Sequence, residues 1–307
     1  MSLKFEQFIR FTTDSVGLER TFRLFQAIVQ ILSAFAIPFD LLLYVLSLAS
    51  AETPSASTTR ITLKALNQRL GLARRYFRLF RFLDSFNAAQ KIYSRLSSPE
   101  SRRGPPRPVW VQVEPWLDVF ARTFNGMYLL LEASTIVDTL QVPGLAIWTS
   151  EWNRSITVEG QRFWLFSLVC GLLYNLLEML NVLAYTSVPA TGDGFGVGKP
   201  EGPGSETEKT DPNEKAADDL KKEQDRLRAI VKNRKEQRRL WRREVSAKIS
   251  KLGRGAMANA LDIVLPGSVV GWINVEPGTV SLAMFVTTIL TGMEAWERCG
   301  REVAANN

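Results

Sequence analysis

Three arginines at helical spacing are the residues of this chain best suited to binding chemistry. Arg74, Arg78 and Arg81 are separated by four and three positions, so a helix over this stretch places them on one face. Guanidinium groups in such a row can contact anionic lipid headgroups. The spacing therefore predicts a basic face that meets a negatively charged surface.

The opposite face of the same stretch is apolar and aromatic. It steps by four, three, four and three positions through Leu72, Tyr76, Leu79, Leu83 and Phe86. A helix with this apolar face and an arginine-rich back is typical of an interfacial membrane binder, in which the aromatic residues enter the acyl boundary. An ordinary packed helix with a solvated basic face is the alternative that the pattern leaves open.

Groups for catalysis and metal binding are scarce. The chain of 307 residues has no histidine, which removes the commonest general base and the usual zinc ligand. Cys170 and Cys299 are far apart and form no metal-binding or redox motif. Serine, cysteine and aspartate are present without a nucleophile elbow, so a membrane-bound lipid enzyme is a weak third hypothesis, after membrane shaping and a metabolite channel. We expect no enzyme activity, no cofactor and no metal.

The net charge of +7 is concentrated in two blocks. Residues 60–103 hold eleven Lys and Arg residues against two acidic ones, and residues 221–254 hold fourteen against four. Such blocks favour a polyanionic partner, either an anionic membrane leaflet or nucleic acid. The apolar segments beside them argue against nucleic acid.

Composition shifts divide the chain into six regions. In order, they are an N-terminal amphipathic helical region (1–96), a Pro-rich linker (97–113), a helical membrane region (114–188), a flexible loop (189–211), a basic helix (212–256) and a Gly-punctuated membrane region (257–307). We predict an all-α fold, a membrane-associated bundle of long amphipathic helices with about two transmembrane helices.

Local signals place several helix boundaries. Asp14 is a candidate N-cap, Pro38 is expected to kink or break an apolar run, and one helix is expected from about Ile61 to Leu96. Asp211 followed by Pro212 predicts another helix start, for a helix that runs to about Leu252.

Two segments are long and apolar enough to span a membrane, residues 163–184 and residues 279–296. Before both of them, Glu132 in the preceding helical pattern is better explained by bundle packing than by lipid. Gly267 and Gly271 have a small-xxx-small spacing that permits close helix–helix packing.

Three stretches in the right order resemble the peroxin-11 family of peroxisomal membrane elongation proteins. The first runs from Phe8 to Gln26, with Asp14 and Gly17 followed by a basic helix. The second is the basic amphipathic stretch from Arg69 to Phe86, and the third is the glycine-punctuated segment from Gly267 to Gly292. The long charged segment 189–256 departs from the usual pattern and leaves the membrane topology open.

The resemblance implies an integral protein of the peroxisomal membrane that inserts an amphipathic helix into one leaflet. Insertion would bend and elongate the membrane before a fission adaptor and a dynamin-related GTPase cut it. The inserting residues would be Leu72, Tyr76, Leu79, Leu83 and Phe86. Arg74, Arg78 and Arg81 would contact the headgroups. An anionic phospholipid membrane and further copies of the chain, as a homo-oligomer, would be the partners, with no nucleic acid.

A membrane channel for small metabolites is the alternative function. Asn175, Glu178 and Asn181 lie within or beside the first predicted span and could line a polar path.

Overall fold

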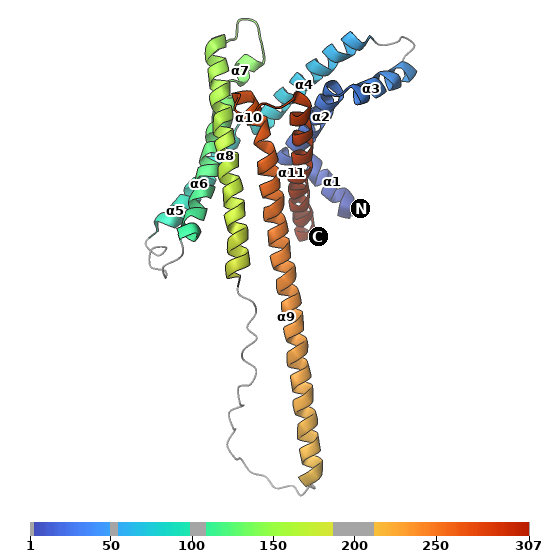
Figure 1. The fold of residues 1–307 in the computed structure, drawn as a ribbon, viewed down its shortest axis with the longest axis vertical. Helices are drawn as coiled ribbons and strands as arrows, with labels where there is room; N and C mark the ends of the chain where they lie inside the picture. Colours follow the sequence, from blue (N-terminus) through green and yellow to red (C-terminus); the bar gives the residue numbers. More distant parts are fainter. Residues whose placement is uncertain (1–2, 50–54, 99–108, 187–211, 307) are drawn as a thin grey trace. The chain divides into compact units, whose positions relative to one another are not determined.

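The computed structural model describes residues 3–49, 55–98, 109–186 and 212–306, and every regular element in these ranges is a helix (Figure 1). The all-α prediction is therefore confirmed. The predicted flexible loop at 189–211 and residues 99–108 of the predicted linker lie outside the described residues.

The N-terminal helices are α1 (Leu3–Thr13), α2 (Ser15–Ala34) and α3 (Ala36–Ala49). Asp14 caps α2 as predicted, because its carboxylate accepts the backbone N–H groups of Val16 at 3.2 Å and Gly17 at 3.1 Å. A Cβ at Gly17 would lie 2.0 Å from the carbonyl oxygen of Phe11, so only glycine permits this approach of α1 to α2. The break after α2 falls at Phe35, and Pro38 is accommodated in the first turn of α3, where its missing N–H costs little.

The predicted helix from Ile61 to Leu96 is two helices, α4 (Ala56–Arg78) and α5 (Arg81–Ser97). The regular ladder gives way to i→i+3 bonds at the break, from Leu79 N to the Tyr76 carbonyl at 3.3 Å and from Leu83 N to the Phe80 carbonyl at 3.1 Å. The break leaves Phe80 at the surface with 70% of its area exposed.

The middle of the chain forms α6 (Val109–Ser134), the single turn α7 (Ile136–Thr139) and the long helix α8 (Ser150–Tyr185). In Figure 1, α5 and α6 lie side by side, and they pack closely against each other. Gly126 of α6 makes this possible, since a Cβ there would lie 2.7 Å from the Phe86 ring. Tyr128 of α6 stacks on Trp164 of α8 with ring centroids 5.3 Å apart.

The C-terminal helices are α9 (Pro212–Asp262), α10 (Val264–Val270) and α11 (Pro277–Asn306). The predicted start of α9 at Pro212 is confirmed, and the helix ends at Asp262 instead of Leu252. Helix α11 packs against α2 and α1, which brings the two ends of the chain together.

The chain divides into two compact units. The first comprises residues 1–178 and 252–307, and the second comprises residues 179–251. Of the described residues, the second unit contains the C-terminal end of α8 and most of α9.

Two helices are long and apolar enough to cross a membrane, Ser150–Tyr185 and Pro277–Ala305. They contain the two predicted spans. Helices α2 and α3 form a pair bent by 99°, which would add a third span or a re-entrant loop if the pair entered the membrane.

Candidate functional site

Charged side chains lie inside the first unit, while many large apolar side chains lie on its surface. Glu19 is 1% exposed and Arg23 is 4% exposed, whereas Phe25 on the same helix is 52% exposed. Water-soluble proteins rarely bury charges unless they are paired, so the interior needs a partner for each of these groups.

Glu19 of α2 is the centre of a first group of ion pairs. Its Oε1 accepts from Arg74 Nε at 3.2 Å and from Arg74 Nη2 at 3.1 Å. Its Oε2 lies 3.5 Å from Arg20 Nε and 4.0 Å from Arg81 Nη1. Arg74 also donates to the side-chain oxygen of Gln26 at 2.6 Å. One buried carboxylate is therefore shared by three guanidinium groups from α2, α4 and α5.

Glu132 of α6 holds a second group. Its Oε1 accepts from Arg78 Nη2 at 2.7 Å and from the Tyr128 hydroxyl at 3.1 Å. Arg75 Nε lies 3.8 Å from the same oxygen, and Arg75 Nη1 donates to Thr139 Oγ1 at 2.7 Å. The expectation that bundle packing explains Glu132 agrees with these contacts, which tie α4 to α6 and α7.

A third group joins α2 to the C-terminal helices. Arg23 Nη2 donates to Asp262 Oδ1 at 2.5 Å and to Thr287 Oγ1 at 3.1 Å, and all three residues are buried. Nearby, Arg298 of α11 pairs with Asp14. The position of Asp262 at the end of α9 thus fixes that terminus to α2 and α11.

These groups surround a partly open cavity of about 710 Å³. Its lining includes six arginines, namely Arg20, Arg23, Arg74, Arg78, Arg81 and Arg298. Four carboxylates line it as well, those of Asp14, Glu19, Asp84 and Asp262. Tyr128 and Trp164 form an aromatic part of the wall.

Arg74 and Arg78 of α4 remain charged at neutral pH. Burial, reinforced by repulsion from Arg78, lowers the pKa of Arg74 to about 10. Burial opposes the charge of Arg78 as well, but Tyr128 and Glu132 together raise its pKa above the usual value. Burial, with the Glu132 carboxylate beside it, raises the pKa of Tyr128 to about 12, so this hydroxyl stays protonated and donates.

The predicted headgroup residues therefore lie on the inner side of α4 and α5. Arg74 and Arg78 have side-chain exposures of 12% and 15% and are engaged in internal ion pairs, and Arg81 is 27% exposed beside Glu19. Contact between these residues and lipid headgroups stays a prediction, and it would require these pairs to open.

The predicted inserting face lies partly on the outer side. Tyr76 and Leu83 are 49% and 57% exposed, and Phe80, which the prediction omitted, is more exposed than either. Leu72 and Leu79 are half-buried. Phe86 is also half-buried because it packs against Gly126.

The predicted packing glycines take part in a turn. Gly271 has φ +84° and forms the left-handed C-cap of α10, where its backbone conformation favours glycine. Gly267 accepts the N–H groups of Trp272 at 3.0 Å and Ile273 at 3.1 Å, and a Cβ at Gly267 would lie 2.5 Å from Ile273. Helix–helix packing at this pair of glycines stays a prediction.

Other small residues do bring helices together. A Cβ at Gly171 of α8 would lie 2.8 Å from the Asn259 amide of α9, and one at Gly255 of α9 would lie 3.2 Å from the Asn175 amide of α8. Asn175, one of the residues considered for a channel, thus packs against α9. Glu178 and Asn181 are half-buried on α8.

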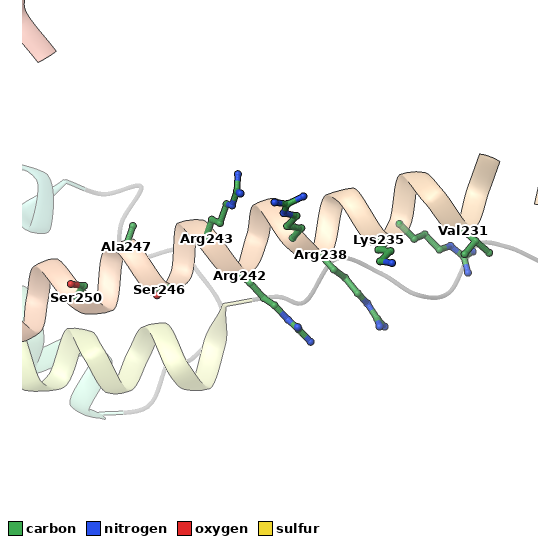
Figure 2. Close-up of a pocket in the computed structure, with 10 residues that line it drawn as sticks. Val231, Lys235, Arg238, Arg242, Arg243, Ser246, Ala247 and Ser250 are labelled. Carbon is green, nitrogen blue, oxygen red and sulfur yellow. The ribbon is translucent and has the colours of Figure 1, made fainter. Parts of the chain in front are cut away.

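The second unit presents a different basic feature. A groove of about 1190 Å³ runs along one side of α9, and the described residues that line it all belong to that helix. Figure 2 shows Lys235, Arg238 and Arg242 along this groove, with the side chains of Arg238 and Arg242 extended away from the helix. These residues are exposed, in contrast to the arginines of the cavity.

Among the residues that the structure describes, no group of three or more histidine, cysteine, aspartate or glutamate side chains is arranged to hold a metal ion. The described helices define an all-helical membrane protein with a charged interior and candidate spans in α8 and α11.

The family model for Peroxisomal biogenesis factor 11 (PEX11) matches residues 5–296. The chain belongs to this family, which confirms the resemblance seen in its sequence. It is therefore a peroxisomal membrane protein that acts in peroxisome biogenesis and proliferation, and the family shapes membranes without enzymatic activity. No curated protein and no solved structure gives a significant match to the chain.

Proposed function

We propose that this chain bends and elongates the peroxisomal membrane by inserting the outer face of α4 and α5 into one leaflet. The inserting residues are Leu72, Tyr76, Leu79, Leu83 and Phe86, with Phe80 added at the break between the helices. The observation that supports this proposal is the exposure of Tyr76, Phe80 and Leu83 on helices whose arginines are turned inward.

The inward ion pairs make this inserting face of α4 and α5, called the wedge from here on, rigid. Glu19 and Glu132 hold α4 from two sides, so its apolar face is presented as a fixed surface. A rigid apolar face that enters the acyl boundary displaces lipid in one leaflet only, and this asymmetry favours curvature.

Downstream steps follow from the same proposal. Copies of the chain assemble on the bent membrane, an anionic phospholipid surface favours insertion, and a fission adaptor with a dynamin-related GTPase cuts the elongated organelle. Membership of the PEX11 family supports this order of events.

The test is remodelling of vesicles by the full-length protein, reconstituted in phosphatidylcholine and phosphatidylserine and observed by electron microscopy. Leu83→Glu removes about 1.5–3 kcal/mol of apolar burial and adds a charge at the acyl boundary, so we expect tubulation to be lost. Leu240→Glu is the matched control, because Leu240 on α9 is also 57% exposed. Tubulation by Leu83→Glu at the level of the control would contradict the wedge.

A further inference from the structure

The cavity of the first unit has more positive than negative charge. Among the described residues, its lining contains six arginines against four carboxylates. Two carboxylates outside the lining also pair with lining arginines, Glu132 with Arg78 and Glu302 with Arg298. Each of them also pairs with an arginine outside the lining, Arg75 and Arg10 respectively, so these pairs leave the difference of two unchanged. Positive charge that is removed from water and lacks a counter-charge is unfavourable, so the cavity as it stands favours an anion.

The excess positive charge lies around Glu19. Among the described carboxylates, Arg20 and Arg81 reach only that of Glu19, at 3.5 Å and 4.0 Å, while Arg74 forms the close pair with it. By contrast, Arg23 has Asp262 and Arg298 has Asp14. Arg20 and Arg81, from α2 and α5, are therefore the guanidinium groups with the weakest internal pairing.

Buried donors without a partner lie around the same cavity. The Nε atoms of four lining arginines are buried and have no hydrogen-bond partner, those of Arg20, Arg23, Arg78 and Arg298. Buried donors in proteins are nearly always paired, so several unpaired donors around one cavity indicate a ligand with many acceptor oxygens. Arginine forks match the geometry of phosphate oxygens.

The size and walls of the cavity narrow the class of ligand. A volume of about 710 Å³ lies within the range of small-molecule sites and is large for a single inorganic ion. Asn125, Asn259, Ser85 and Thr291 add neutral polar groups to the lining, and Tyr128 and Trp164 add a flat aromatic wall. These groups suit a polar organic body that carries phosphate.

We propose that this cavity binds a phosphate-bearing organic anion, with Arg20 and Arg81 as its main ligands. This site uses the inner face of α2, α4 and α5, so it is independent of the outer apolar face that the wedge uses. The anion comes either from a phospholipid headgroup or from a free metabolite, since both present the same oxygens.

Two probes with phosphate at the same two positions of the inositol ring separate these sources. Full-length protein in detergent is titrated calorimetrically with inositol 1,4-bisphosphate and, separately, with dioctanoyl phosphatidylinositol 4-phosphate. Tighter saturable binding of the soluble probe than of the lipid probe assigns a free organic phosphate. Tighter binding of the lipid probe assigns a headgroup. Either result supports the site. If neither probe binds saturably, the proposal is overturned.

Variants then locate the binding. We expect the double variant Arg20→Gln with Arg81→Gln to weaken binding at least about tenfold, since it removes two charge-assisted contacts. The matched control is Arg238→Gln with Arg242→Gln, which removes the same charge from α9 and should stay within about twofold. An equal loss in both double variants overturns the proposal.

The melting temperature of each variant tests whether misfolding explains a loss of binding. Without ligand, the cavity variant relieves repulsion around Glu19, so its melting temperature should equal or exceed that of the wild type. If the melting temperature of the double variant falls and binding is lost, the single variant Arg81→Lys separates misfolding from loss of the site. Lysine keeps the positive charge but lacks the two-pronged geometry of the guanidinium group. Weakened binding with an unchanged melting temperature then supports the site. Unchanged binding in Arg81→Lys overturns the role of Arg81. Vesicle tubulation, which depends on Leu83, is expected to persist in all these variants.

Discussion

Two pairs of arginines with the same spacing lie in opposite environments. Arg74 and Arg78 on α4 are four positions apart, inside the first unit, with Glu19 and Glu132 as their partners. Arg238 and Arg242 on α9 are also four positions apart, but they extend from an exposed side of the second unit (Figure 2). Residue type and spacing are therefore no guide to whether a basic row is solvated.

The difference lies in the helices around each pair. Helix α4 packs against α2 and α6, each of which brings a carboxylate to the arginines. The arginines of α9 line a groove to which, among the described residues, no other helix contributes a side chain. The first pair is thus a structural connection, and the second is available to an external anion or remains solvated.

Charge reversal separates the two pairs most strongly. Arg78→Glu would place a carboxylate against Glu132 inside the bundle, and we expect a loss of at least about 3–5 kcal/mol of stability, since a buried pair is broken and like charges are brought together. Arg242→Glu would form an i,i+4 pair with Arg238 and should change stability by only about 0.2–0.5 kcal/mol, in the favourable direction.

The measurement is chemical denaturation of the purified full-length protein in detergent, with the yield of folded protein by size-exclusion chromatography for variants that are too unstable to titrate. Similar losses in the two variants would remove the distinction between the two pairs. A loss in Arg242→Glu alone would reverse it.

Much of the helical framework was predictable, because it follows from local signals. The cap at Asp14, the start of α9 at Pro212 and the two long apolar helices all depend on residues close together in the chain. The break at Leu79 and Phe80 was not predictable in this way, because the sequence there contains neither glycine nor proline and continues the helical period.

The orientation of the helices was harder to foresee. The row of Arg74, Arg78 and Arg81 indicated a basic face but not what it faced. The missed residues are the partners Glu19 and Asp262. Glu132 was expected to pack within the bundle, but its pairing with Arg78 was not foreseen. Each of these carboxylates is distant from its arginine in sequence. A signal was present: Glu19 and Arg23 recur on the polar stripe of α2, opposite an apolar stripe. In a membrane bundle such a polar stripe faces the interior.

Chemical labelling tests the two environments without mutation. Phenylglyoxal modifies accessible guanidinium groups, and peptide mass spectrometry measures the rate at each arginine. We expect Arg238 and Arg242 to react at least about tenfold faster than Arg74 and Arg78, because the buried pair must open locally before it reacts. Equal rates would show that the ion pairs to Glu19 and Glu132 are open in solution, which would favour headgroup contact by the α4 arginines.

The pH dependence of stability should be the smallest of the predicted effects. It distinguishes charges that stay fixed near neutral pH from charges that titrate there. The chain has no histidine, Arg74 keeps its proton until about pH 10, and Tyr128 keeps its proton until about pH 12. The raised pKa of Tyr128 contributes stability that is fully present below pH 10 and is lost as the pH rises through 12. The lowered pKa of Arg74 has the opposite sign, because its buried charge disfavours folding until that charge is lost above pH 10.

Between pH 6 and 9 neither of these groups changes its charge, so the melting temperature of the full-length protein should stay nearly constant. Differential scanning fluorimetry across this range, at fixed ionic strength, measures it. The variant Tyr128→Phe should show the same flat profile, because the hydroxyl does not titrate there. A clear fall in the melting temperature between pH 6 and 9 would mean that a buried charge in the bundle changes its protonation near neutrality, contrary to the network of fixed charges around Glu19 and Glu132.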